Sequence, residues 1–325
     1  MSFSKEIIEI DPRGDLILHV TSATGQRFLK VCSKVLCLTS PVFRTMLESP
    51  TFQEGIGLLS ATPESPFETQ LHDDHYESLL IVINAMHLRT RHIPLMLPVE
   101  AFYQLAIVCD KYDVAEIFLP WVKIWTGKWR MEQVSGEKWL VIAWVFKLGK
   151  AFEDVTKGMI YDSPLQLDFT IQAQERVDTG VVPDSVLRSV RTVRQKTADA
   201  VLSLALQEFE RYQSSVESKT TVCQIPNNFN SPCNKACDSL ALGTLMRCLF
   251  DAKLWPISID TSANIRSVLN CFISMDSLSN FLSSSNHNQC CPSKRLKPPS
   301  LKLLEAMEGL KLSDFCQPEE IFVPK

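Results

Sequence analysis

The sequence lacks a long hydrophobic run, a secretory leader and an excess of positive charge. Its longest apolar stretches, such as residues 139–146, are too short to cross a bilayer. Residues 1–15 contain acidic residues and a Pro-Arg-Gly but no apolar core segment. The formal net charge of -4 argues against nucleic acid as the main partner. Together with the lack of an Asn-x-Ser/Thr sequon, these absences predict a soluble, cytoplasmic or nuclear protein that binds neither membranes nor nucleic acid.

Signatures of catalysis are also missing. The sequence contains no Gly-x-Ser-x-Gly, no phosphate-binding loop and no dinucleotide fingerprint, and Gly55-Ile56-Gly57 lacks the strand–turn–helix setting that such a motif requires. The six histidines are scattered along the chain. We therefore predict a protein that is not an enzyme. The alternative is an enzyme in the C-terminal half, to which only the cysteines and histidines point.

The composition allows one or two globular domains. The chain has 325 residues, of which 45% are hydrophobic and 22% are charged, and these are ordinary values for a globular protein. A chain of this length can bury a sizeable core, as two domains or as one domain with a long extension.

The first 125 residues alternate between strand and helix patterns. Two β-prone runs, 15–20 and 27–31, flank a turn that contains glycine, which predicts a hairpin. Residues 33–48 show helical spacing, and Pro41 splits them into two short helices. Further on we expect a loop with one edge strand, followed by three helices, over residues 55–72, 76–86, 98–112 and 117–125. Residues 10–125 are thus predicted to form a small α/β domain.

The remainder of the chain is predicted to be mainly α-helical. Helical patterns cover residues 130–160, 183–209, 238–250, 262–275 and 301–312. We divide it into a helical extension, 126–212, and a cysteine-containing region, 213–325, with local disorder over the polar residues 278–300. The helix that begins at residue 183 carries a basic face, interpreted as solvated, of Arg188, Arg191, Arg194 and Lys196.

Four segments of the N-terminal domain resemble the BTB (POZ) domain in order and spacing. Gly14–Leu18 is similar to the family's opening strand, and residues 32–47 are similar to its helix pair, with matches at Lys34, Leu36, Ser40, Phe43 and Met46. Residues 76–87 and 105–114 are similar to the next two helices, the latter with matches at Asp110, Tyr112 and Val114. Ser33 departs from the family's usual histidine, and residues 84–86 lack its common aromatic residue.

Residues 119–125 and 144–146 are more similar to the filamentous-fungal branch of the family. The resemblance implies a small sheet flanked by helices that serves protein–protein interaction. Members that dimerise by strand exchange carry a longer N-terminal helix and strand, so the resemblance does not favour that mode of self-association here.

The resemblance also suggests a partner. In BTB proteins that act as substrate adaptors of cullin-type ubiquitin ligases, a hydrophobic-x-Glu element follows the helix pair, and Phe52-Gln53-Glu54 matches it in type and place. An exposed aromatic side chain would anchor in a pocket of the cullin scaffold, and the carboxylate would orient a basic group. Two alternatives stay open: Phe52 folds back onto the domain, or the domain is an oligomerisation module of a nuclear transcriptional regulator. No motif in the sequence identifies the protein that the C-terminal region would bind as its client.

Asp15 and Lys34 are candidates for a charged pocket. Each lies at the start of a predicted element among apolar residues, and lone buried charges are costly, so the two are expected to pair if they point to one place. In some family members the corresponding acid and base line a ligand groove. A structural ion pair, or two exposed charges, is the alternative.

Eight of the eleven cysteines lie beyond residue 220. Cys233-x3-Cys237 and His287-x2-Cys290 have the spacing of metal ligands, and together they would form a tetrahedral Cys3His zinc site, in which Cys223 or Cys291 could replace a member. Such a zinc ion would be structural because no coordination position is left open. The alternative is a set of free thiols.

Overall fold

The computed structural model describes residues 6–22, 25–127, 136–165, 180–223, 232–258, 262–275 and 285–316. It divides into two compact units: unit 1 comprises Met1–Phe152, Val177–Val182 and Leu312–Lys325, and unit 2 comprises Glu153–Arg176 and Pro183–Lys311. A small sheet with helices, followed by a mainly helical region, agrees with the predicted layout. The division differs from the three predicted segments, whose boundaries lie at residues 125 and 212.

Unit 1 contains a mixed four-stranded sheet in the order β1-β3-β2-β4. The predicted hairpin is confirmed, because β2 (Leu16–Ser22) pairs antiparallel with β3 (Gly25–Val31). The predicted edge strand is β4 (Phe67–Leu71), which lies parallel to β2. The short strand β1 (Ile7–Glu9) pairs parallel with β3 and was not expected, since three residues carry no readable periodicity.

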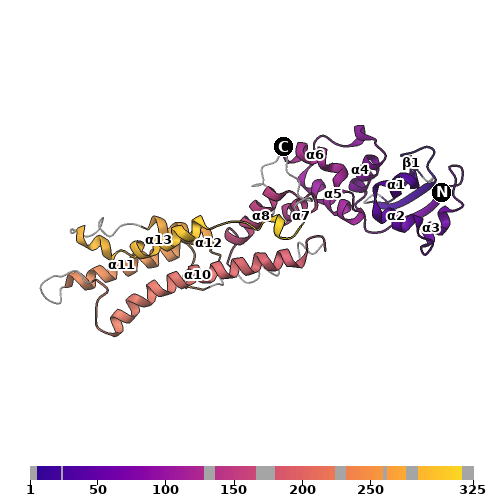
Figure 1. Cartoon of the computed structure of the whole chain (residues 1–325). Coiled ribbons are helices and arrows are strands. Elements are labelled where there is room, and N and C mark those ends of the chain that lie inside the picture. The colour runs from indigo at the N-terminus through magenta and orange to yellow at the C-terminus, as the bar shows by residue number, and fades with distance from the viewer. Residues whose placement is uncertain are drawn as a thin grey trace. The chain divides into compact units, whose positions relative to one another are not determined.

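Seven described α-helices belong to unit 1 (Figure 1), with bounds α1 Ser33–Thr39, α2 Pro41–Glu48, α3 Gln53–Leu58, α4 Tyr76–Met86, α5 Val99–Tyr112, α6 Leu119–Thr126 and α7 Gly136–Val145. Short 3-10 turns add η1 Thr90–His92, η2 Ala115–Phe118 and η6 Leu312–Asp314. The split at Pro41 is confirmed. The hydroxyl oxygen of Ser40 accepts a bond from the Phe43 amide and donates one to the Tyr112 carbonyl, which ties α2 to α5.

Helix α7 belongs to the core of unit 1, which explains why this unit extends past residue 125. The ring of Phe102 on α5 lies 6.5 Å from that of Trp139 on α7 and 5.2 Å from that of Phe146. The same Phe102 ring lies 5.3 Å from Trp125 on α6. Because these rings bury one another, α7 packs with the preceding helices and does not start a separate extension.

The helices of unit 2 are α8 Gly149–Tyr161, whose first residues lie in unit 1, α10 Asp184–Glu217, α11 Pro232–Asp251, α12 Ile265–Ser274 and α13 Pro292–Glu305, with a 3-10 turn η5 Ser285–Cys290. Helices α11, α12 and α13 contact the long helix α10 (Figure 1). None of the described helices combines the length and the hydropathy that crossing a membrane requires.

The predicted disorder over 278–300 is wrong for the 3-10 turn at 285–290 and for 292–300, the first part of α13; residues 276–284 lie outside the described part. Helix α13 buries Leu296 and Ser300 against its neighbours and accommodates Pro298 and Pro299 within its length. Composition alone suggested disorder because the segment is rich in serine, asparagine, proline and lysine, whereas tertiary contacts decide its conformation.

The predicted basic face of α10 is wrong at Arg194. This side chain is only 6% exposed and donates hydrogen bonds to the carbonyl oxygens of Met159 at 3.1 Å and Ile160 at 2.9 Å. It also donates to the carbonyls of Ser163 and Pro164. These acceptors belong to the end of α8 and the residues that follow, where helical carbonyls lack intrahelical donors. Arg194 therefore caps α8, and burial lowers its pKa.

Candidate metal centre and an exposed helix face

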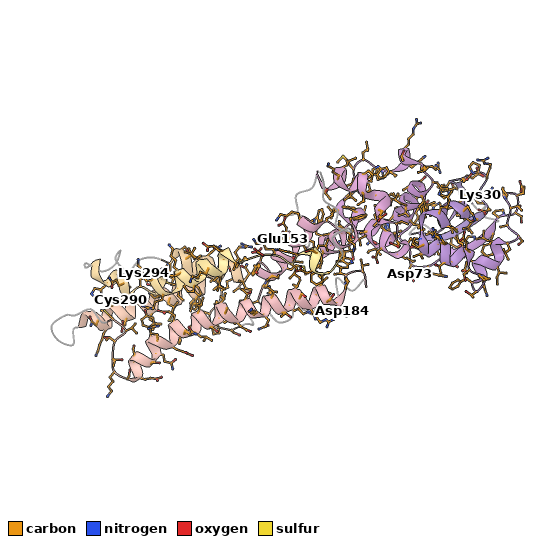
Figure 2. The ribbon with its side chains drawn as sticks, viewed as in Figure 1. Lys30, Asp73, Glu153, Asp184, Cys290 and Lys294 are labelled. Carbon is orange, nitrogen blue, oxygen red and sulfur yellow. The ribbon has the colours of Figure 1, made fainter. Side chains whose placement is uncertain are left out.

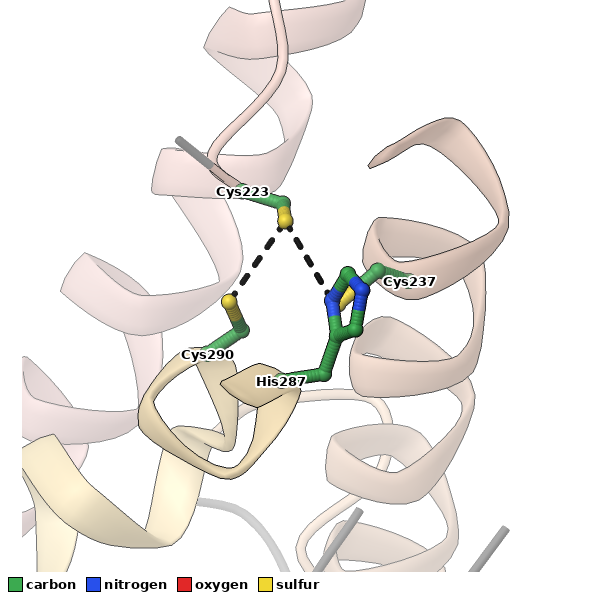
Figure 3. A group of neighbouring side chains, drawn as sticks. All are labelled: Cys223, Cys237, His287 and Cys290. Atoms are coloured by element: carbon green, nitrogen blue, oxygen red, sulfur yellow. Dashed lines mark hydrogen bonds between the residues drawn. The ribbon is translucent and has the colours of Figure 1, made fainter. Parts of the chain in front are cut away.

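Four side chains from three parts of unit 2 converge on one point. Cys223 follows α10, Cys237 lies on α11, and His287 and Cys290 lie on η5 (Figure 3). Their ligand atoms all lie within 4.8 Å of one another. Cys223, Cys237 and His287 are buried, and Cys290 is half-buried. The group lies at the opposite end of unit 2 from Asp184, the first residue of α10, as the positions of Asp184 and Cys290 in Figure 2 show.

The distances within this group fit a tetrahedral metal site. The sulfur atom of Cys223 lies 3.5 Å from Nδ1 of His287 and 3.5 Å from the sulfur of Cys290. Zinc bonds sulfur at about 2.3 Å and nitrogen at about 2.0 Å, so the edges of its tetrahedron measure roughly 3.5 to 3.8 Å. A disulfide requires sulfur atoms about 2.05 Å apart. These two separations fit the edges of such a tetrahedron and are too long for a disulfide, and all four ligand atoms lie within 4.8 Å of one another.

Polar contacts fix the loop that carries Cys223. The carboxylate of Asp238, on α11, accepts hydrogen bonds from the amides of Val222 at 2.7 Å and Cys223 at 2.9 Å. The side-chain amide of Asn234 donates to the Cys223 carbonyl at 3.2 Å. Contacts of this kind around a metal ligand determine where its donor atom points.

A buried ion pair fixes the other side of the group. Arg295 on α13 donates from Nε to both carboxylate oxygens of Glu208 on α10, each at 2.9 Å. It also donates to the Tyr212 hydroxyl at 2.8 Å and to the Cys290 carbonyl at 3.5 Å. Because Glu208 is 4% exposed, its charge depends on this pairing. Arg295 thus ties the end of η5 to α10.

Without a bound cation, burial favours the protonated form of these thiols. Burial, together with the neighbouring sulfur atoms of Cys290 and Cys223, raises the pKa of Cys237. Burial and the nearby Cys223 raise the pKa of Cys290 to about 11. A divalent cation reverses this balance because it stabilises the thiolate directly. The group is a set of soft ligands that suits zinc.

Three of the four predicted ligands, Cys237, His287 and Cys290, are brought together by the fold. The side chain of Cys233 lies outside the described residues. The fourth converging side chain is Cys223, one of the two replacements named beside Cys291. Sequence spacing favoured Cys233 because it is close to Cys237 in the chain, whereas Cys223 approaches only through the turn that Asp238 holds.

The predicted pairing of Asp15 with Lys34 is wrong. The two oxygens of the Asp15 carboxylate accept bonds from the Ser33 amide at 2.7 Å and the Ser33 hydroxyl at 2.6 Å, at the start of α1. The Lys34 side chain is 77% exposed and lies 3.6 Å from Glu48. Asp15 satisfies unpaired donors at a helix start, so it needs no lysine. Ser33, where the resembling family has histidine, supplies the second donor.

Phe52 and Glu54 lie at the start of α3 and not in a turn. The side chain of Phe52 is 46% exposed and does not fold back into the core. Ile56 is 55% exposed and Leu59 is 86% exposed. Because these positions follow Phe52 by four and seven residues, they continue the same helix face. Glu54 is half-exposed in the first turn of α3. We call Phe52, Ile56 and Leu59 the exposed stripe.

The two glycines of α3 explain why this short helix packs closely. A β-carbon at position 55 would overlap the backbone of Ser49 after α2, and a β-carbon at position 57 would overlap the Phe67 ring on β4. Glycine therefore permits close contact with α2 and β4 on the inner side. Ile56 within α3, and Phe52 and Leu59 at its two ends, stay exposed and form the exposed stripe.

Comparison with known proteins identifies no relative: no protein-family model matches the chain, and the search of curated proteins returns no match.

Proposed function

We propose that this chain is a non-enzymatic interaction protein, in which unit 1 is a BTB-like docking domain and unit 2 is a helical domain stabilised by a structural zinc ion. The exposed stripe on α3 carries the first part of the proposal. Three large apolar side chains at helical spacing are solvated on a rigidly packed helix, next to a carboxylate. Such a face gives an apolar anchor with little ordering cost on binding.

The partner that fits best is the helical scaffold of a cullin-type ubiquitin ligase. Support comes from the four sequence segments that resemble the BTB family and from the position of Phe52 directly after the α1–α2 pair. In the proposed complex, Phe52 fills an apolar pocket of the scaffold and Glu54 orients a basic side chain at its rim.

Binding of a purified fungal cullin to the full-length chain tests this function. The double variant Phe52→Ala/Glu54→Ala is expected to bind at least tenfold more weakly, since truncation of an interface anchor costs about 2 kcal/mol or more. Leu95→Ala is the matched control, because Leu95 is 67% exposed but lies outside α3. Absence of binding by the wild-type chain, or equal loss in the control, would reject the cullin partner. Self-association without cullin binding would instead favour an oligomerisation module.

The zinc proposal rests on the convergence of Cys223, Cys237, His287 and Cys290. Four protein ligands complete a tetrahedron, so the ion would stabilise the fold and leave no position for a substrate. It would link the turn after α10, helix α11 and η5, three segments that are distant in sequence.

Metal analysis of the purified chain tests this proposal, with one zinc ion per chain as the expected result. Cys290→Ser is expected to lower the zinc content severalfold. Cys291→Ser is the matched control, because this adjacent thiol is more deeply buried than Cys290 but contacts the Ser293 hydroxyl at 3.0 Å and is not one of the converging ligands. Zinc-free protein with unchanged helicity would overturn the proposal, as would equal zinc loss in the two variants.

A further inference from the structure

A second pair of cysteines in unit 2 is distinct from the candidate metal centre. The sulfur atoms of Cys248, on α11, and Cys271, on α12, lie 2.6 Å apart. This is closer than the roughly 3.5 Å or more at which non-bonded heavy atoms normally rest, and closer than the 3.5 Å sulfur separation between Cys223 and Cys290. The Cys271 thiol also lies 3.0 Å from the Cys248 carbonyl oxygen.

Metal binding does not account for this proximity. The described residues contain one group of three or more converging cysteine, histidine or acidic side chains, and neither Cys248 nor Cys271 belongs to it. Two thiols alone supply half of a tetrahedral site. The chemistry that remains for two adjacent thiols is formation of a covalent bond between them.

The surroundings of the two thiols give them different roles. Cys271 is half-buried and reachable from solvent, whereas Cys248 is 5% exposed. A hydrogen bond from the Cys248 thiol lowers the pKa of Cys271, against the opposing effect of burial. The same contact and burial raise the pKa of Cys248. Cys271 is thus the more accessible of the two thiols and the one that deprotonates more readily, so it reacts first, and Cys248 is the neighbouring thiol that follows.

We propose that Cys248 and Cys271 form a reversible dithiol switch that hydrogen peroxide oxidises to a disulfide between α11 and α12. The Cys271 thiolate attacks one peroxide oxygen, the O–O bond breaks, and Cys271 becomes a sulfenic acid while water leaves after protonation. The Cys248 sulfur then attacks the Cys271 sulfur and displaces the sulfenic oxygen as a second water. The two thiols together lose two electrons and two protons, and the peroxide is reduced to two waters.

The disulfide would link α12 to α11. Helix α12 has ten residues and is held in the unit by the buried side chains of Ile265, Val268, Leu269 and Phe272. The bond joins positions 23 residues apart, and such a loop closure restricts the unfolded chain. We expect the oxidised form to unfold at a temperature roughly 5 to 10 °C higher than the reduced form.

The test uses the reduced full-length chain with its zinc retained and excess reductant removed. Hydrogen peroxide is added, and peptides are mapped by mass spectrometry without reduction. The expected product is a Cys248–Cys271 linked peptide that disappears after dithiothreitol. Cys271→Ser should abolish this link. Cys316→Ser should leave it unchanged, because Cys316 is also half-buried but contacts Lys147 at 3.4 Å.

A second variant isolates the first chemical step. In Cys248→Ala, the Cys271 sulfenic acid has no partner and should accumulate as a dimedone adduct, severalfold above wild type. Peroxide treatment of the wild-type chain that leaves both thiols reduced would overturn the proposal. So would a link from either cysteine to one of the candidate metal ligands in place of the Cys248–Cys271 peptide.

Discussion

Nδ1 of His287 lies 3.5 Å from the sulfur of Cys223, although 64 positions separate the two residues in the chain. Neither residue is near the other in an unfolded chain, so the pair exists only after α10, α11 and η5 have packed. Binding of the proposed zinc ion would therefore be coupled to the folding of unit 2, and its removal would lower stability.

Asp238→Asn is expected to weaken zinc binding by about 10-fold to 100-fold without removing a ligand. An asparagine keeps one oxygen acceptor, whereas the Asp238 carboxylate receives the amides of both Val222 and Cys223. Competition with a chromophoric chelator measures the change. Ser239→Ala is the control, since Ser239 is exposed and bonds the Lys235 carbonyl of its own helix. Equal affinity in wild type and Asp238→Asn would show that the turn is fixed by other contacts.

The sequence predicted best those residues of the candidate metal centre that lie close together in the chain. His287 and Cys290 lie in a single turn, so their spacing alone revealed them as a ligand pair. Cys223 contributes through tertiary structure, because its position depends on Asp238 on another helix. Sequence spacing therefore identified three of the converging side chains and named Cys223 and Cys291 as replacements, but it gave no reason to prefer Cys223 over Cys291.

Arg194→Met is expected to destabilise unit 2 by about 3 kcal/mol, because the buried carbonyls at the end of α8 lose their donors. Lys196→Met, at an exposed position two residues later, should change stability by about 0.5 kcal/mol or less. Urea unfolding followed by circular dichroism gives both values. A similar small effect for the two variants would mean that other donors or water satisfy the α8 carbonyls.

Unit 1 is expected to lose stability as the pH falls below about 6.5, through His87. Burial lowers the pKa of His87 from its ordinary 6.5. Its Nε2 accepts the Cys32 amide at 3.1 Å and Nδ1 donates to the Ile83 carbonyl, which requires the neutral ring. A lowered histidine pKa means that its stabilisation is complete above the unfolded pKa and is lost as the pH falls toward the folded one.

Urea unfolding between pH 7.5 and 5 tests this expectation. His87→Gln should reduce the loss of stability on acidification. His72→Gln, at an exposed position, should leave the pH dependence as in wild type. Identical pH profiles for wild type and His87→Gln would exclude His87 as the titrating group.

Glycine substitutions in two helices should change stability in opposite directions. Gly57→Ala is expected to destabilise unit 1 by about 1 to 3 kcal/mol, because the added methyl group overlaps the Phe67 ring. Gly158→Ala, on α8, meets open space and should stabilise the helix by about 1 kcal/mol. Thermal unfolding of the two variants measures the difference. Stabilisation by both would show that Phe67 moves aside without cost.

The fold was most predictable where local chemistry decides structure. The β2–β3 hairpin and the break at Pro41 follow from short-range patterns, and the structure contains both. Arg194 and the segment 285–300 were misassigned because composition suggested solvent exposure, while the structure buries Arg194 and folds α13. The predicted Asp15–Lys34 pair was wrong for a related reason. Asp15 accepts hydrogen bonds from Ser33, and no pattern of charges in the sequence reveals that contact.

Some residues of α3 and its ends pack against unit 1, and others are exposed to solvent. A β-carbon at position 55 would overlap the Ser49 backbone and one at position 57 would overlap the Phe67 ring, whereas Phe52, Ile56 and Leu59 are exposed and contribute little to the core. Mutations on the outer side can therefore accumulate without unfolding unit 1. Substitutions at these exposed positions could change the binding partner and leave the packed residues of unit 1 as they are. The surface on which we base the proposed function is therefore also the one that evolution can alter most freely.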